Sequence, residues 1–186
     1  IEVWITNRTG ATESVRKIIG FTDLGEHVPY RDIVRGPVQS IPNSLPDNYA
    51  NQLYSNLQQI TGLRVQGNTG LVANTGYGLE NGIDYVGVTA RKLNTTEYSF
   101  NPQLGYISLN TQINPDDVLA VAFRYTYNGR TFQVGEFAED LPPLPGQPID
   151  TTQQQTQQPS TSSQKVLYLK MLKTTSPSPR LPIWNL

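Results

Sequence analysis

Apolar residues alternate or cluster with the period of β-strands along most of this 186-residue chain. The stretch IEVWI at 1–5 is rich in β-branched and aromatic residues, and VRKIIGF at 15–21 follows it after a polar turn. The short connection at 6–10 favours a hairpin between these two strands, although a helix over 12–19 is the alternative. Four prolines between 25 and 46 exclude a long helix there and predict a loop.

One segment, from 46 to 61, has the period of an amphipathic helix. Its apolar residues recur at three- and four-residue spacing, and Ser44 or Asp47 is placed to cap it. Gly62 would end the helix. The residues of the apolar face are Tyr49, Leu53, Leu57 and Ile60. The following stretch, 62–82, is dense in Gly and Asn, and we expect turns there with short strands at Leu63, Val65, Leu71 and Val72.

The segment from 83 to 137 predicts the β-rich heart of the fold. IDYVGVTARKL, which begins at Ile83, predicts a strand or a ragged turn. A hairpin with its turn at 101–105 would place Ile107 and Leu109 on one face. VLAVAFRYTY, which begins at Val118, predicts a central strand that is buried on both faces near its start. The sequence Asn128–Gly129 then predicts a tight turn, with RTFQVGEF as the return strand.

These elements predict an α+β, mainly β fold. We expect an antiparallel sheet or sandwich-like module with one amphipathic helix and long Pro- and Gly-rich loops. Residues 1–140 would form the β-rich module, with its helix near 46–61. The Pro- and Gln-rich stretch 141–164 predicts a flexible excursion within one sheet, with a domain boundary as the alternative. Residues 165–186 would bring a returning strand and the truncated start of a next segment.

Composition narrows the possible functions. The net charge is −1, so no overall field attracts nucleic acid, and aromatic residues do not interleave with a basic stripe. The chain has no Cys, which excludes disulfides, thiol nucleophiles and Cys-type metal sites. No apolar run is long enough for a membrane-spanning helix. The apolar segments at both ends predict a piece of a longer polypeptide.

Few residues suggest catalysis. His27 is the only histidine and lies in a Pro-rich loop, where a solvated or capping role is expected. Asp116 and Asp117 have the composition of a turn. The acids Glu136, Glu139 and Asp140 follow the last strand of the heart, but none forms the defined pair that glycoside hydrolysis needs. We therefore predict no catalytic, metal or cofactor-binding residues, no cofactor and no enzymatic activity.

Three short motifs also favour structural interpretations. Gly76, Gly78 and Gly82 miss the dinucleotide fingerprint by one residue and have no strand–turn–helix context, so they predict turns. LPPLP at 141–145 predicts a stiff polyproline spacer, with a docking motif as the alternative. The glycosylation sequons at Asn7 and Asn94 carry little weight on their own.

Several longer segments together resemble the SprA/Sov family of Bacteroidetes. They are EVWITNRTG at 2–10, KIIGFTDLGE at 17–26, ARKLNTTEYSFNPQLGYISLNTQINPDDVLAVAFRYTYNGRTFQVGEF at 90–137 and LYLKMLKTTSPSPRLPIWNL at 167–186. They occur in the right order, whereas the Pro-, Gly- and Gln-rich stretches between them match poorly. The combination of LGYISLN, VLAVAFRYTYNGRTFQVGEF and LPIW is more specific than any of these motifs alone.

The resemblance implies a structural or interaction module of an outer-membrane protein translocon that serves gliding motility and type IX secretion. Its implied location is the outer membrane, exposed to the periplasm or the cell surface. The implied partners are other parts of the parent barrel and accessory proteins of the secretion system, with secreted cargo as a further candidate. It implies no nucleic acid, and membrane association only through the parent chain. The competing hypotheses are a free-standing surface binding module, for example for carbohydrate, and a hydrolase, which lacks an acid pair.

Overall fold

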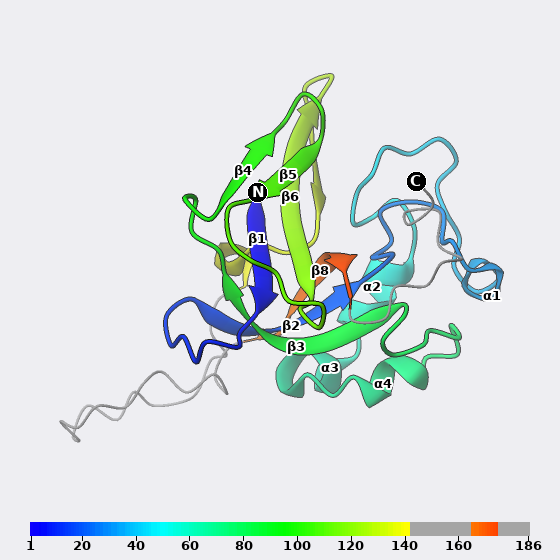
Figure 1. Ribbon diagram of the computed structural model, residues 1–186. Helices are drawn as coiled ribbons and strands as arrows, with labels where there is room; N and C mark the ends of the chain where they lie inside the picture. Colours follow the sequence, from blue (N-terminus) through cyan, green and yellow to red (C-terminus); the bar gives the residue numbers. More distant parts are fainter. Residues whose placement is uncertain (142–164, 175–186) are drawn as a thin grey trace, which may run out of the picture.

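Six strands form one mixed sheet in the order β1-β3-β2-β8-β6-β7, and β4 pairs with β5 in a second, smaller sheet (Figure 1). This computed structural model describes residues 1–141 and 165–174, and it is mainly β, with 35% strand and 15% helix. The strands are β1 (Glu2–Thr6), β2 (Val15–Phe21), β3 (Tyr85–Lys92), β4 (Tyr98–Asn101), β5 (Tyr106–Leu109), β6 (Leu119–Tyr127), β7 (Arg130–Val134) and β8 (Leu167–Lys173). The helices are α1 (Asp32–Arg35), α2 (Leu53–Gln58), α3 (Thr61–Gln66), α4 (Gly70–Ala73) and the 3₁₀ helix η1 (Ala138–Asp140).

The larger sheet closes on itself. Because β1 pairs with β6 as well as with β3, the strands β1, β3, β2, β8 and β6 form a small barrel. Its interior is filled by a cluster to which every one of these strands contributes, and Trp4 is the largest side chain in it. Small residues sit around this indole, as a narrow barrel requires. The cluster consists of Trp4, Ile18, Ala90, Ala120, Ala122, Leu167 and Leu169.

The sheet departs from the predicted antiparallel arrangement at one pairing. Strand β8 runs parallel to β2, with Ile18 opposite Leu167, and antiparallel to β6 on its other side. The apolar segment predicted to resume near 165 is therefore a strand inside the barrel sheet. The predicted excursion lies outside the described residues from 142 onward, as does the chain after Thr174.

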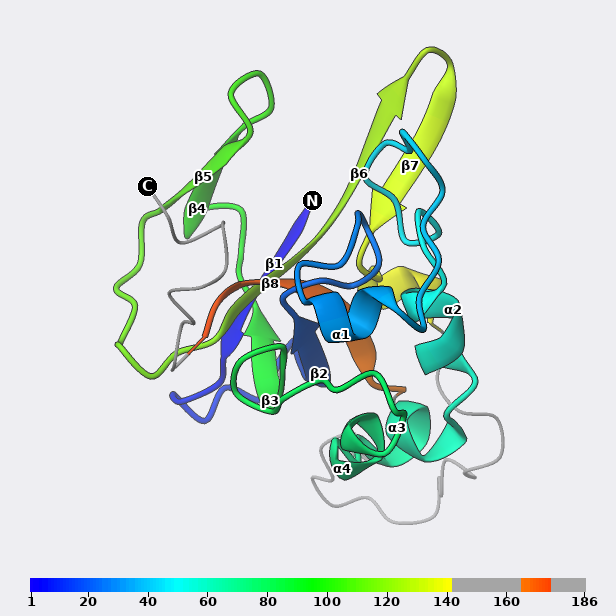
Figure 2. The same cartoon turned by 90° about the vertical axis from the view of Figure 1, so that its right-hand side faces the viewer.

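The four α-helices cover one side of the barrel (Figures 1 and 2). A second core fills the space between them and strands β2, β3 and β8. Phe21 makes aromatic contacts there with Tyr168 and Tyr85, whose ring centroids lie 5.7 and 6.1 Å from its own. Leu53 and Leu57 of α2 pack into the same core and are fully buried.

The predicted helix over 46–61 is wrong in its extent. Residues 47 and 48 instead form a loop that bonds to β7: the Gln133 N–H donates to the Asp47 carboxylate (3.0 Å), and the Asn48 N–H donates to the Gln133 carbonyl (2.8 Å). These bonds compete with helix formation. Helix α2 begins only at Leu53, whose N–H donates to the Asn51 side chain (2.9 Å).

The helical region also continues further than predicted. The backbone is extended at Ile60, and α3 then begins at Thr61, so Gly62 lies inside a helix. Gly67 ends α3 in the left-handed conformation, with φ 67°. The short strands expected between 62 and 82 are wrong, because α3 and α4 occupy that region. The Gly and Asn residues in this stretch are typical of turns, and for this reason the two short helices were not predicted.

The predicted hairpin of the first two strands is also wrong. Both strands exist, but β3 lies between them and pairs with β2 along seven residues, from Val15 to Phe21. The connection at 7–14 is long enough to let β2 separate from β1. The heart of the fold is confirmed: the hairpin turn at 101–105, the tight turn at Asn128–Gly129 and the burial of the first part of β6 all occur.

Candidate interaction surface

Two β-hairpins project from the same end of the barrel, and we call them the β4–β5 arm (98–109) and the β6–β7 arm (123–134) (Figure 2). Strand β6 belongs to the barrel at its start, where residues 119–122 are buried, and to the arm from Phe123 onward, where the side chains become partly or fully exposed. The N-terminal end of β1 lies between the two arms.

Aromatic side chains stiffen the β6–β7 arm. Tyr125 stacks against Phe123 and Phe132, with ring centroids 6.2 and 5.3 Å apart. Its hydroxyl donates to the Pro46 carbonyl (2.7 Å), which fastens the arm to the loop beside it. A two-stranded hairpin alone is marginally stable in water, so these contacts and the attachment to the barrel hold the arm in place. Beyond them, Tyr127 is 55% exposed near the tip.

The β4–β5 arm has no charged residue between 98 and 109. Tyr98, Ile107 and Leu109 pack at its base against the outer face of β1 and β6. Phe100, Leu104 and Tyr106 are 41%, 74% and 50% exposed. These exposed apolar side chains make the β4–β5 arm a candidate contact surface.

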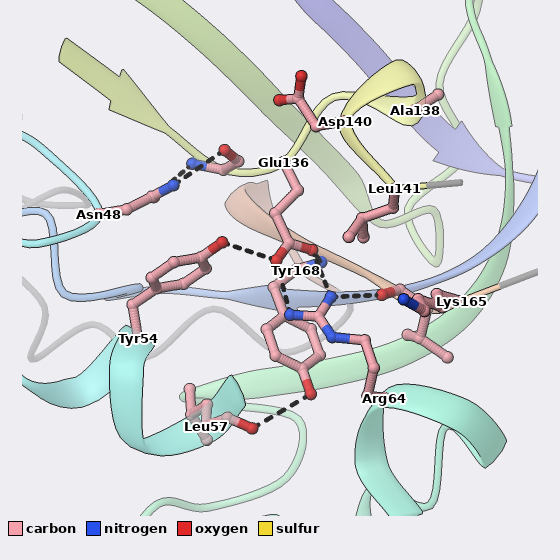
Figure 3. A network of polar contacts seen from close by, with 12 residues as sticks. Asn48, Tyr54, Leu57, Arg64, Glu136, Ala138, Asp140, Leu141, Lys165 and Tyr168 are labelled. Atoms are coloured by element: carbon pink, nitrogen blue, oxygen red, sulfur yellow. Dashed lines mark hydrogen bonds and ion pairs between the residues drawn. The ribbon is translucent and has the colours of Figure 1, made fainter. Parts of the chain in front are cut away.

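A buried ionic network lies where α2 and α3 pack against β8 (Figure 3). The Glu136 carboxylate accepts two hydrogen bonds from the Arg64 guanidinium (2.6 and 2.7 Å), one from the Tyr54 hydroxyl (2.8 Å) and one from the Tyr168 N–H (2.7 Å). Arg64 also lies over the Tyr168 ring, 3.8 Å from its centroid. The side chains of Glu136 and Arg64 are 3% and 11% exposed, so this charge pair is closed to substrates.

Burial and the neighbouring Glu136 carboxylate shift the pKa values of Tyr54 and Arg64. Burial raises the pKa of Tyr54, and the adjacent Glu136 charge raises it further, so this phenol stays protonated as a donor. Burial alone would lower the pKa of Arg64, but its hydrogen bonds and charge contact with Glu136 outweigh burial and raise it. The network therefore ties α2, α3, β8 and the end of β7 together.

A second buried charge cluster joins β8 to the loop after β2. Lys170 donates to the Glu26 carboxylate and to the Thr22 carbonyl (2.5 Å). Asp23 accepts from the Gly25 N–H (2.9 Å) through one oxygen, while its other oxygen is buried without a hydrogen-bond partner among the described residues. Burial, followed by the charge of Glu26, raises the pKa of Asp23 to about 7.

The three acidic residues after β7, Glu136, Glu139 and Asp140, do not come together in one site. Glu136 is buried in the network described above, whereas Glu139 is exposed on η1. Asp140 contacts Arg124 (3.5 Å) and accepts from the Gln133 side chain (2.9 Å). Within 1–141 and 165–174, no three His, Cys, Asp or Glu side chains gather as a metal site would require.

The other residues weighed from the sequence have local contacts. His27 is exposed, and its carbonyl accepts from the Asn51 side chain (2.5 Å). Asp117 accepts from Arg8 (2.6 Å) and from the Asn114 N–H (2.8 Å), which closes the predicted turn, while Asp116 is exposed. Burial alone would raise the pKa of Asp117. The hydrogen bonds from Asn114 and Arg8 outweigh burial, so the pKa is lowered.

The remaining motifs lie in loops. Gly76, Gly78 and Gly82 have positive φ angles of 77°, 65° and 87°, as turns require. The Asn7 side chain exchanges hydrogen bonds with the backbone of Ala11, and Asn94 is exposed. LPPLP lies outside the described residues after Leu141.

The sequence alone did not identify the residues that are buried as charges. Arg64 and Lys170 occur in stretches that read as a Gly-rich loop and an ordinary strand. Their partners are 72 and 144 positions away along the chain, so no local pattern connects them.

No helix in the described part of the chain combines the length and apolarity needed to cross a bilayer. The scan against protein-family models and the search of curated proteins gave no match for this chain.

Proposed function

We propose that this chain is a structural and interaction module of an outer-membrane protein translocon, and that its two arms contact other parts of that assembly. The arms carry this proposal: they project from a closed barrel and expose Phe100, Leu104 and Tyr127 on surfaces almost free of charge. A purely structural domain would be expected to bury such residues against itself.

The assignment to a type IX secretion translocon rests on the resemblance to the SprA/Sov family. The described parts of the segments that carry the resemblance fall on β1, β2, the end of β3, both arms and β8, while LPIW lies outside the described residues. In this role the module contacts neighbouring parts of the parent barrel or accessory proteins of the secretion system, at the periplasmic or outer face of the outer membrane. It performs no catalysis in this role.

The test is made in the full-length parent protein of a gliding bacterium. Deletion of the whole module is expected to reduce both secretion and colony spreading, with Leu104→Ser and Tyr127→Ser together giving a smaller defect of the same kind. Immunoblotting of the outer-membrane fraction checks that the parent protein is still present. Secretion and spreading that remain intact after deletion would reject the proposed role.

The competing function is a surface binding module for carbohydrate. The exposed tyrosines favour it, because Tyr106, Tyr127 and Tyr49 are each at least half exposed and offer flat rings with a polar end. A glycan array probed with the isolated chain distinguishes the two functions. Sugar binding that is lost with Tyr106→Ala or Tyr127→Ala would favour this alternative over the translocon module.

A further inference from the structure

Three ionisable side chains meet at the end of β2, on the helix-covered side of the sheet. Lys170 of β8 lies opposite Phe21 of β2 in the ladder, and its amine reaches the loop that follows β2. There the ammonium donates to the Thr22 carbonyl and to the Glu26 carboxylate. Lys170 and Glu26 are 9% and 8% exposed, so this ion pair is almost withdrawn from water.

Asp23 adds a second carboxyl group to the same place. One of its oxygens accepts from the Gly25 N–H (2.9 Å), and the other is buried without a hydrogen-bond partner among the described residues. Burial, the charge of Glu26 and a hydrogen bond to Glu26 raise the pKa of Asp23 to about 7. A protonated Asp23 that donates to Glu26 satisfies the buried oxygen and leaves one negative charge facing one lysine.

The surroundings of Glu26 suit attack by an amine on its carboxyl carbon. Its oxygen Oε2 accepts from the Leu24 N–H (2.6 Å), which would stabilise the negative charge that develops on this oxygen during attack. Burial alone would lower the pKa of Lys170, but the charge and the hydrogen bond of Glu26 outweigh burial and raise it, so the ammonium is the resting form. In a site withdrawn from water, transfer of its proton to the carboxylate gives a neutral amine, which is a nucleophile.

We propose that Lys170 and Glu26 condense to an amide, a covalent isopeptide bond between β8 and the loop after β2, with Asp23 as the acid and base of the reaction. The Lys170 Nζ first gives a proton to the Glu26 Oε1 and then attacks the Glu26 carboxyl carbon. Asp23 donates its proton to the departing Oε1, which leaves as water, and takes the next proton from Nζ. One C–N bond forms, one C–O bond breaks, one water is released, and Asp23 ends with its proton restored.

A second lysine–carboxylate pair shows what this cluster has in addition. Lys92 donates to Glu2 (3.1 Å), but its side chain is 35% exposed and keeps part of its hydration. The other Glu2 oxygen accepts from the Trp4 indole (3.2 Å) and the Ala138 N–H (3.1 Å) rather than from an acid. We expect no condensation at this pair, which makes it the internal control.

The bond joins positions 144 residues apart in the chain. Strand β8 lies between β2 and β6 in the sheet and follows a stretch outside the described residues, so the bond ties it covalently to the neighbouring part of the barrel. Because a cross-link of this span restricts the unfolded chain, it stabilises the fold.

Intact-mass spectrometry of the full chain gives the first test. After folding and complete denaturation, the measured mass is expected to be lower than the sequence mass by one water. The chain has no Cys, so no disulfide contributes to a change in mass. Material recovered unfolded from inclusion bodies should have the full mass and lose water only on refolding. A folded chain that keeps its full mass after prolonged incubation would overturn the proposal.

Digestion of the denatured chain with trypsin locates the bond. The fragments 18–31 and 166–173, which contain Glu26 and Lys170, should be recovered as one cross-linked species with no cleavage after Lys170. Tandem mass spectrometry should place the bond at Glu26, and Lys92 should be found unlinked. A bond from Lys170 to Asp23, or loss of water without a cross-link, would reject the assignment.

Matched variants test the two roles. Lys170→Met should abolish the loss of water, whereas Lys173→Met on the same strand should leave it unchanged, because the hydrogen bonds of Lys173 go to backbone carbonyls. Asp23→Asn keeps the shape of the side chain but cannot protonate the leaving oxygen, so it should slow the loss of water at least about hundredfold. Circular dichroism checks that each variant is folded. Loss of water at the parent rate in folded Asp23→Asn would overturn the role of Asp23, and its persistence in Lys170→Met would overturn the bond.

This inference goes beyond the proposed function and does not depend on it. The mass of the isolated chain decides whether the bond forms, whereas deletion of the module from the parent protein decides the role in secretion. A folded chain of full mass, with secretion impaired by deletion, rejects the bond and leaves the function standing. A bonded chain whose deletion leaves secretion intact rejects the function and leaves the bond standing.

Discussion

The helix-covered side of the barrel buries charges in pairs, whereas the two arms expose aromatic rings and carry only Arg124 and Arg130 as charges. On the first side, Glu136 and Lys170 each bond to a partner from a distant part of the chain. Buried charges of this kind are costly to separate and so hold segments in one arrangement. On the arms, the exposed aromatic rings contribute little to the stability of the fold. The difference indicates that one side stabilises the fold, and we propose that the other contacts a partner.

The largest effect is expected from Arg64→Met. It leaves the Glu136 carboxylate buried without its cation, and we expect a loss of about 3–5 kcal/mol in the free energy of unfolding. Urea denaturation followed by circular dichroism measures it. Addition of Glu136→Gln should restore part of the loss, since the amide oxygen can still accept from Tyr54.

The matched control for this variant is Arg91→Met. Arg91 also makes two hydrogen bonds to a carboxylate, that of Glu97 (2.8 and 2.9 Å), but the side chains of this pair are 19% and 24% exposed. We expect a loss of about 1 kcal/mol or less there. Equal losses for Arg64→Met and Arg91→Met would contradict the distinction between a buried clamp and a surface pair.

An intermediate, pH-dependent effect is expected from Asp23→Asn. The pKa of Asp23 is about 7 in the folded chain and about 3.9 in an unfolded one. The folded state therefore holds a proton that the unfolded state has already lost, so this carboxyl lowers stability progressively as the pH rises from about 4 to 7. Asn mimics the protonated form and removes this dependence.

Thermal unfolding of both forms across that range provides the measurement. The melting temperature of Asp23→Asn should rise relative to that of the parent chain as the pH increases, and the two should converge near pH 4. A constant difference between them at every pH would show that Asp23 does not bind a proton more tightly in the folded state. Asp116→Asn, at an exposed carboxyl, is the control for the loss of one negative charge.

The smallest effect on stability is expected on the arms. Leu104 is 74% exposed and Tyr127 is 55% exposed, so Leu104→Ser and Tyr127→Ser should each change the free energy of unfolding by less than about 0.5 kcal/mol. Urea denaturation checks this. A loss of several kcal/mol would mean that the arms belong to the core, and the comparison between the two sides would fail.

Local patterns were sufficient for most strands. VLAVAFRYTY combines a long apolar start with an Asn-Gly turn, and this combination was enough to predict β6, the turn and β7 from the local sequence. The arms are the part of the candidate site that could be predicted, because their hairpins depend on short-range turn chemistry. Their role as a partner surface stays a proposal, as does the family that the sequence resembles.

The residue pattern predicted most of the strands, the turns of the two arms and the mainly β class, because alternation and turn residues act over a few positions. The folded structure alone showed that β3 separates β1 from β2 and that β8 joins the barrel in parallel. It also decided that Arg64 and Lys170 are buried, since their stabilising partners are brought together only when the chain closes the barrel. Contacts between such distant positions leave no local pattern from which they could be predicted.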